Sequence, residues 1–455
     1  KKMNKNYILL IAVLLLSPFR IVGQKEVNTD DTILNFLNLK FGMFIHYNMG
    51  TYQAEQWAYP FHDPKDFKPS QLDCNQWAQA AKSAGMQYAV FTTKHHDGFS
   101  LWDTKVSNYD IASAHNKYKN LDIVKEYTDA FRNAGIKVGL YFSVWDRHHG
   151  MEHGNINQEN ISFTKEQLTE LLTNYGEINC IVIDGWGSKW GNGPDFEELP
   201  YETLEAHIHS IQPNCLVINH SCRPDLKYTQ IVHYEATHGQ HCPYDNTIPS
   251  QQGPTLQSTW FWEKGYENQE LKSVDEVVKE LNFANSHYSN YLLNAAPNDK
   301  GLMDENVLER LKQIGDATTI SAPLKKLPEI KPVHQGVSVK ASSSSSKEFG
   351  ANHIIDADLF TRWQYAQDDK ERWIELDFKS PKTFNRVICG EYKRAVQEFK
   401  IEAFINGEWK LLVKGGNIRN NFNASFETVT AQKYRLTILK ASRLPYIAEL
   451  TFVKY

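Results

Sequence analysis

The chain has 455 residues, of which 41% are hydrophobic and 23% charged, an ordinary globular balance that allows two domains with sizeable cores. Its 49 Lys and Arg against 54 Asp and Glu give a net charge of −5, and no basic run stands out, which argues against nucleic acid as a partner. Aromatic residues reach 12%, with 11 Trp; most should belong to the core, but their faces are also suited to stacking on sugars.

The N-terminal segment 1–23 has the features of a signal peptide. Three lysines flank the start of an apolar run over residues 8–16, which is too short to cross a bilayer comfortably. We therefore expect an exported bacterial protein, periplasmic or secreted, with no integral membrane span once the signal peptide has been removed.

Residues 24–325 alternate short apolar segments with amphipathic ones. Helices are expected at 75–85, 121–135 and 164–176, each ending at a glycine. The apolar segments are typical of strands buried on both faces, and they lie at 42–47, 88–93, 137–143, 180–184, 215–219, 231–235, 258–262 and 290–294. Eight such units predict a (β/α)8 TIM-like barrel. A doubly wound sheet is the second choice, because no G-x-G-x-x-G follows the first strand.

Polar and aromatic side chains stand at almost every predicted strand end, which is where a barrel places its active site. These residues are His46, His95, His96, Tyr141 to Trp145, Asp184, Asn219, Glu235, Trp260 to Trp262 and Asn294. So many of them at strand ends predict one convergent pocket.

Asp184 and Glu235 each end a buried apolar segment, where packing alone does not explain a carboxylate. One alternative for Asp184 is that it caps the following helix. Two carboxylates at barrel strand ends are also what a glycosidase needs. In a retaining enzyme they stand about 5–5.5 Å apart, one as the nucleophile and the other as the general acid/base.

The histidine-rich segments 94–98 and 233–241 allow a different interpretation. Their imidazoles could bind zinc or another metal in a metal-dependent barrel hydrolase, although no H-x-H ends the first strand. Neutral imidazoles can instead donate to and accept from the ring hydroxyls of a sugar. A further alternative is a non-catalytic sugar-binding protein, against which the presence of both Asp184 and Glu235 argues.

Residues 326–336 form a predicted linker, within a segment that holds three prolines and no periodicity. Beyond it, residues 337–455 show short strands at regular spacing, which predict an antiparallel β-sandwich of the jelly-roll type. These strands are expected at 372–378, 384–392, 399–407, 408–415, 432–439 and 446–455.

Six segments between residues 35 and 315 occur in the order FGMFIHYNMGTY, TTKHHDGFSLWDTKVSNYD, KVGLYFSVWDRHH, QLTELLTNYG, IVIDGWG and LLNAAPNDKGLMDE. Each is weak alone, but the ordered set resembles glycoside hydrolase family 29, the retaining α-L-fucosidases. The tail segment GANHIIDADLFTRWQYA resembles a discoidin-like (coagulation factor C-terminal type) carbohydrate-binding domain, which is often attached to bacterial enzymes of this kind.

The resemblance implies an exo-acting hydrolase that releases terminal α-L-fucose from a fucosylated oligosaccharide or glycoconjugate, with retention and without a metal in catalysis. It makes Asp184 the nucleophile and Glu235 the general acid/base, with Glu263 as the second candidate for the latter role. Substrate contacts would come from His46, Trp57, His95, His96, Tyr141, Arg223 and Trp260. The oligomeric state stays open.

Gln56 departs from the family pattern, which often has Glu-Trp where this chain has Gln56-Trp57. A glutamine keeps hydrogen bonding but loses the charge, so Gln56 is expected to contact the sugar with an altered preference. The alternative activity is α-L-galactosidase on the same scaffold, since α-L-galactose adds only a hydroxyl at C6 and an apolar pocket rejects an added hydroxyl modestly.

A structural calcium ion is a further expectation for the C-terminal domain. By resemblance, its ligands would be Asp358, Thr361 and Glu449, and oxygen ligands of this kind suit Ca²⁺. The alternative is a tight turn stabilised by Asp side chains. Such a calcium would lie far from the chemistry.

Overall fold

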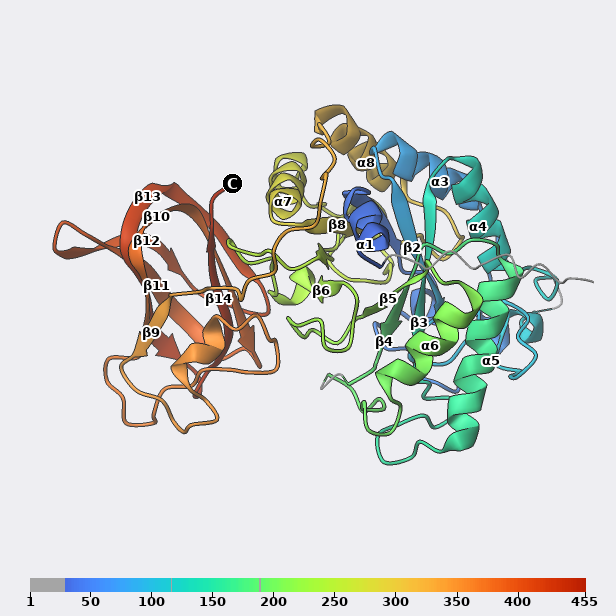
Figure 1. The fold of residues 1–455 in the computed structure, drawn as a ribbon, viewed down its shortest axis with the longest axis horizontal. Coiled ribbons are helices and arrows are strands. Elements are labelled where there is room, and N and C mark those ends of the chain that lie inside the picture. Colours follow the sequence, from blue (N-terminus) through green and yellow to red (C-terminus); the bar gives the residue numbers. More distant parts are fainter. Residues whose placement is uncertain (1–28, 116, 188–189) are drawn as a thin grey trace, which may run out of the picture.

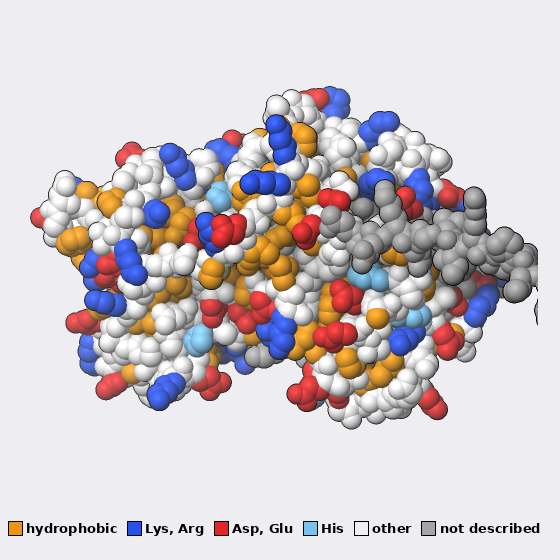
Figure 2. Space-filling model, in the orientation of Figure 1, with side chains coloured by type: hydrophobic (Ala, Val, Ile, Leu, Met, Phe, Trp, Pro, Cys, Tyr) orange, Lys and Arg blue, Asp and Glu red, His pale blue; other side chains and the backbone are white. Residues whose placement is uncertain are grey.

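The structure is a computed structural model that describes residues 29–115, 117–187 and 190–455. Figure 1 shows two units side by side, a barrel wrapped by helices and a β-rich C-terminal domain. The predicted signal peptide lies outside the described residues. Within the described part of the chain, no helix is both long and apolar enough to cross a membrane. On the face shown in Figure 2, basic and acidic side chains are interspersed, and neither sign gathers into one large patch.

The predicted barrel is confirmed, with parallel strands in the order β5-β4-β3-β2-β1-β8-β7-β6. The strands are β1 (Phe41–Ile45), β2 (Tyr88–Lys94), β3 (Lys137–Ser143), β4 (Cys180–Asp184), β5 (Leu216–Asn219), β6 (Val232–Tyr234), β7 (Ser250–Gln252) and β8 (Ser289–Asn294). The helices are α1 (Thr29–Leu37), α2 (Met49–Gln53), α3 (Cys74–Ser83), α4 (Ile123–Asn133), α5 (Gln158–Asn174), α6 (Tyr201–Ile211), α7 (Val274–Ser286) and α8 (Glu305–Ala317). The strands are buried almost throughout, and apart from β7 their sequences are largely apolar, as expected for a sheet covered on both faces.

The seventh strand does not lie where the sequence predicted it. We expected 258–262, but β7 is Ser250–Gln252, paired in parallel with β6 and β8, and 258–262 belongs to the loop that follows. The residues of β7 are polar and give no apolar signal, yet they are buried because partners satisfy them. Gln251 hydrogen-bonds His233 Nδ1 at 2.9 Å and accepts from Tyr88 at 3.3 Å.

The helix layer is incomplete beside β6. Residues 220–249 are all described, and no α-helix connects β5 to β6 or β6 to β7, so the regular alternation that we expected is wrong here. The C-terminal domain covers this gap instead (Figure 1). Val232 and Tyr234 of β6 share one apolar cluster with Ile388 and Val453 of the C-terminal domain, so burial of apolar surface holds the two units together.

The C-terminal domain is an antiparallel β-structure, as predicted, around an apolar core of its own. Its strands are β9 (Ser338–Ala341), β10 (Trp373–Tyr392), β11 (Val396–Ile405), β12 (Glu408–Gly415), β13 (Phe422–Ala441) and β14 (Tyr446–Val453). The expected strands 372–378 and 384–392 are a single strand, because the Lys-Ser-Pro-Lys sequence between them is a bulge rather than a turn. This bulge lets the first half of β10 pair with β9 and the second half with β14.

Candidate active site

A cavity of about 430 Å³ opens where the barrel strands end, the usual position of an active site in this fold. Side chains at or after the ends of seven strands line it, and these are His46, His95, His96, Trp145, Asp184, His220, Glu235 and Trp260. Gln56 and Trp57, which follow α2, line it as well. The predicted pocket residues from β1, β2, β4 and β6 therefore do converge.

Asp184, the last residue of β4, is held in a fixed orientation. The Tyr141 hydroxyl donates to Oδ2 at 2.7 Å, and the Gly185 N–H donates to Oδ1 at 2.6 Å. Burial, and then the neighbouring Asp184, raise the pKa of Tyr141 well above its usual range, so the phenol stays protonated as a donor. Gly185 has φ +71°, and a Cβ there would lie 2.4 Å from Trp145 Cβ, so only glycine lets the chain turn this closely. Tyr141 thus acts on Asp184 and is not part of the cavity lining.

Three buried imidazoles lie beside this carboxylate. Burial lowers the pKa of His46 to about 3 and that of His96 to about 4, and it holds the pKa of His95 well below its usual range, so all three are neutral near pH 7. His46 Nδ1 bonds Asn294 Oδ1 at 2.7 Å, and His96 Nδ1 bonds Ser143 Oγ at 2.7 Å. In His46 and His96, the Nδ1 atom is thereby engaged, and the Nε2 atom is left for a ligand or, in His96, faces Asp184.

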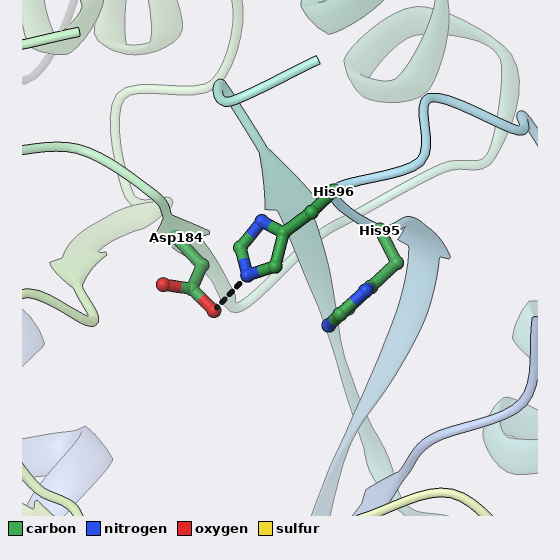
Figure 3. Close-up of side chains that lie close together, drawn as sticks. All are labelled: His95, His96 and Asp184. Atoms are coloured by element: carbon green, nitrogen blue, oxygen red, sulfur yellow. Dashed lines mark ion pairs between the residues drawn. The ribbon is translucent and has the colours of Figure 1, made fainter. Parts of the chain in front are cut away.

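His95, His96 and Asp184 also form a compact donor cluster, with one ligand atom of each within 4.8 Å of the others (Figure 3). His96 Nε2 lies 3.5 Å from Asp184 Oδ2. Two imidazoles and a carboxylate are donors that divalent metals accept, so a metal-dependent hydrolase would use this cluster. However, both Asp184 oxygens already accept short hydrogen bonds, which orients the carboxylate without a metal.

Glu235 lies across the cavity from Asp184, with His220 between them. His220 Nδ1 is 3.5 Å from Asp184 Oδ2, and its Nε2 is 3.6 Å from Glu235 Oε2. Neither ring nitrogen of His220 has a hydrogen-bond partner among the described residues. The two carboxylates therefore face the same space, which is the arrangement that two-carboxylate glycoside hydrolysis requires.

Glu235 is paired with His238, whose Nδ1 lies 2.7 Å from Glu235 Oε1. Burial favours the neutral acid, but His238, His220 and the Cys222 thiol outweigh it and hold the pKa of Glu235 below its usual range. In return, although burial disfavours its charged form, Glu235 raises the pKa of His238 above the usual value. The pairing therefore favours an ionised Glu235 beside a protonated His238.

Several predicted residues have other contacts. Glu263 does not line the cavity and accepts from Gln56 Nε2 at 3.1 Å, so the geometry favours Glu235 as the general acid/base. Gln56 Oε1 accepts from the N–H groups of Trp260 and Phe261 at 3.0 and 3.1 Å, so this side chain holds the Trp260 segment in place. Arg223 also lies outside the lining.

The partner of Arg223 is Asp225, at 3.0 Å, rather than a substrate or acid in the cavity. Further lining side chains were not predicted, and these include Trp190, His220, Arg394 and Asn420; His238 lies within the histidine-rich segment 233–241 that the sequence had indicated. His220 had a signal, since it directly follows β5, where we had singled out Asn219. Arg394 and Asn420 had none, because they come from the C-terminal domain.

Comparisons with known proteins identify the family to which this chain belongs. Residues 24–321 match the family model described as Alpha-L-fucosidase. The chain belongs to the alpha-L-fucosidase family. It is a glycoside hydrolase with alpha-L-fucosidase activity, and its residues 338–450 match the F5/8 type C domain.

Relatives of this alpha-L-fucosidase include plant and animal proteins. Alpha-L-fucosidase 1 of Arabidopsis thaliana is 27% identical over 441 residues, covering 90% of this chain and 84% of that protein. The plasma alpha-L-fucosidase of Homo sapiens is 26% identical over 320 residues, covering 62% of this chain and 66% of that protein. A solved glycoside hydrolase family 29 member from an unknown rumen bacterium aligns with a TM-score of 0.57 at 25% identity, over 93% of this chain and 76% of that one.

The predicted calcium loop of the F5/8 type C domain brings carboxylates together. Thr361 Oγ1 donates to Asp356 Oδ2 at 2.7 Å. Burial first, and then Asp356 and Asp358, raise the pKa of Glu449 well above its usual range. Glu449 Oε1 has no hydrogen-bond partner among the described residues. Carboxylate oxygens are the donors that Ca²⁺ takes, but Asp356, Asp358 and Glu449 do not form one of the compact ligand groups among the described residues.

We had expected this loop to lie far from the catalytic cavity, but it packs close to it. Gln240, five residues after Glu235, donates to the Ala357 carbonyl at 2.6 Å. The Phe360 ring lies 5.6 Å from that of Trp190, which lines the cavity. The loop packs against the barrel because the C-terminal domain covers β6.

Proposed function

We propose that this fucosidase is a retaining, exo-acting enzyme that hydrolyses terminal α-L-fucosyl linkages of glycans by double displacement. The observation that carries the proposal is the placement of Asp184 and Glu235 on one cavity, with His220 between the two carboxylates. Tyr141 and the Gly185 N–H orient Asp184, so its carboxylate is prepared to attack a bound sugar.

In the first step, Asp184 attacks C1, the bond from C1 to the leaving oxygen breaks, and Glu235 delivers a proton to that oxygen. In the second step, Glu235 takes a proton from water, the water oxygen attacks C1, and the Asp184 carboxylate leaves. Two inversions give net retention. Glu235 can take this proton from His238, whose Nδ1 lies 2.7 Å from its Oε1, and the proton gained from water in the second step returns to His238.

The neutral imidazoles suit an uncharged sugar. His46, His95 and His96 can each donate to or accept from a ring hydroxyl with little electrostatic cost. Trp260, whose ring lies 4.9 Å from that of His46, offers an apolar surface to the C6 methyl of fucose, worth about 1 kcal/mol. An α-L-galactoside would place a hydroxyl there, so matched fucosides and galactosides measure this preference.

Retention is tested by trapping. Incubation with a 2-deoxy-2-fluoro-α-L-fucosyl fluoride should add one fluorofucosyl unit to the peptide that contains Asp184, detected by mass spectrometry. NMR of the first product from an α-L-fucoside should show α-fucose. Immediate formation of β-fucose, without an adduct, would overturn the double-displacement proposal.

We also propose a structural calcium at Asp358, Thr361 and Glu449 and no metal in catalysis. Calcium would offset the repulsion among the buried carboxylates. Added Ca²⁺ should then raise the melting temperature, and EDTA should lower it while leaving hydrolysis of a small fucoside unchanged. Loss of that hydrolysis with EDTA would instead favour a metal at His95, His96 and Asp184.

Export is the last part of the proposal, and it rests on residues 1–23. Fractionation of expressing bacteria should recover the enzyme in the periplasm or medium. N-terminal sequencing should then place the mature start near Gly23. Recovery of the uncleaved chain in the cytoplasm would contradict export.

A further inference from the structure

The C-terminal domain is fastened to the loop that follows Glu235. Asn421 Nδ2 donates to the Ala236 carbonyl at 2.8 Å. Gly239 has φ +93°, and a Cβ there would come within 2.4 Å of the Asn420 carbonyl oxygen and 3.2 Å of Gly390 Cα. The two backbones therefore meet at a distance that no side chain at position 239 would permit.

The same domain also supplies two side chains to the catalytic cavity. Arg394 stands in the turn between β10 and β11, and Asn420 in the loop between β12 and β13; both are exposed and both line the cavity. Among the described residues, no hydrogen bond or ion pair engages the guanidinium of Arg394 within the protein. The N–H donors of this guanidinium therefore have no internal acceptor in that part of the chain and remain available to a ligand in the cavity.

The cavity continues between the two units. A second hollow of about 150 Å³ shares Trp190, His238 and Asn420 with the first and extends along Tyr392 and Lys393 of the C-terminal domain. The ring of Trp190 lies 5.8 Å from that of His238 and 5.9 Å from that of Tyr392. An aromatic surface therefore lies beside the donors of Arg394 and Asn420.

The position of Glu235 decides which part of a substrate reaches these groups. The proton donor must stand beside the leaving oxygen, and His238 contacts that donor directly. Residues next to His238 therefore face the group that departs, whereas His46, His95 and His96 face the sugar that Asp184 attacks.

We propose that Arg394, Asn420 and Trp190 form a binding site for the sugar to which fucose is attached, built jointly by the barrel and the C-terminal domain. The ligand is a pyranose: its hydroxyls accept from Arg394 and Asn420, and its apolar face lies on the indole. The proposal rests on the exo-fucosidase mechanism, since that mechanism defines the leaving-group side.

The test compares two substrates in the full-length enzyme. One is a branched α-1,3/1,4-fucosylated oligosaccharide, and the other is α-L-fucosyl fluoride, which has no sugar as leaving group. In Arg394→Ala combined with Asn420→Ala, kcat/KM for the oligosaccharide should fall about 10- to 100-fold more than kcat/KM for the fluoride, the loss expected for hydrogen bonds from a charged donor. Both residues are exposed, so the variant should fold.

Arg419→Ala is the matched control, because Arg419 is an exposed arginine beside Asn420 that does not line the cavity. It should leave the ratio of the two rates unchanged. Equal losses on both substrates, or no loss, would overturn the proposed site. If the parent enzyme hydrolyses the fluoride but the double variant leaves the ratio of the two kcat/KM values unchanged, only the proposed binding site fails. If the parent enzyme hydrolyses no α-L-fucoside, the proposed mechanism fails as well.

Discussion

The two sides of the catalytic cavity are built differently. On the barrel side, His46, His95, His96 and Asp184 stand at strand ends. The three imidazoles are buried, and His46, His96 and Asp184 are hydrogen-bonded to Asn294, Ser143 and Tyr141. On the domain side, the lining comes from long loops and a second domain, and it consists of Trp190, His238, Arg394 and Asn420. From this difference we infer a division of work: the rigid side would recognise the sugar that reacts, and the assembled side would meet the varied group that leaves.

The largest expected effect is on the barrel side. Asp184→Ala removes the proposed nucleophile, so kcat should fall about 10⁴-fold or more on every fucoside, whatever its leaving group. Added azide should partly restore turnover and give β-L-fucosyl azide, because it enters from the face that Asp184 vacates. Product analysis by NMR checks this, and an α-azide from this variant would contradict the assignment.

Glu235→Gln tests the proposed proton donor, which stands between the two sides of the cavity. The amide cannot donate a proton to the leaving oxygen, so kcat/KM for an oligosaccharide should fall about 10²- to 10⁴-fold. The loss should be much smaller for α-L-fucosyl fluoride, since fluoride departs with little help from an acid. Glu263→Gln serves as the control, because Glu263 lies outside the cavity and should show no such dependence on the leaving group.

A smaller, pH-dependent effect is expected from His238→Gln. Because Glu235 is ionised and His238 holds the proton of the pair, the alkaline limb of kcat/KM should follow the raised pKa of His238. Glutamine cannot carry that proton, so the limb should move to lower pH and activity at neutral pH should fall.

Full pH profiles of the parent and variant measure this shift. His153→Gln is a matched control, since His153 pairs with Glu198 at 2.9 Å on the exposed surface and does not line the cavity. An alkaline limb that does not move in the His238 variant would show that the catalytic proton does not reside on His238.

The two sides of the cavity also differ in how well the sequence predicted them, and the barrel side was the more predictable. Strand ends of a barrel converge whatever the loops do, so an acid or histidine directly after an apolar run, such as Asp184 or His96, could be placed in advance. The seventh strand was not predicted because Ser250–Gln252 is polar and its burial depends on partners such as Tyr88, far away in the sequence. Trp260 still reached the cavity, since it lies in the loop after that strand.

The domain side had no comparable signal. Arg394 lies in a turn of a separate β-domain, and only the docking of that domain on β6 brings it to the cavity. Docking depends on which surface lacks a helix, a property of the whole chain rather than of any short segment. The same cause misplaced the calcium loop, whose Ala357 proved to contact Gln240.

The smallest expected effect concerns the contact that joins the two sides. Asn421→Ala removes the hydrogen bond to the Ala236 carbonyl, which should lower the free energy of unfolding by about 1 kcal/mol. Because Ala236 adjoins Glu235, a looser loop should also reduce kcat/KM for an oligosaccharide by a few-fold more than that for the fluoride. Denaturant unfolding and paired rate measurements check both values.

Asn417→Ala is the appropriate control for this contact. Asn417 is an exposed asparagine in the same loop, with no cavity contact, and its substitution should change neither stability nor the ratio of the two rates. A loss of stability in Asn421→Ala with an unchanged ratio would mean that the C-terminal domain only braces the barrel. A changed ratio would mean that it also positions the proton donor, since Asn421 itself lies outside the cavity.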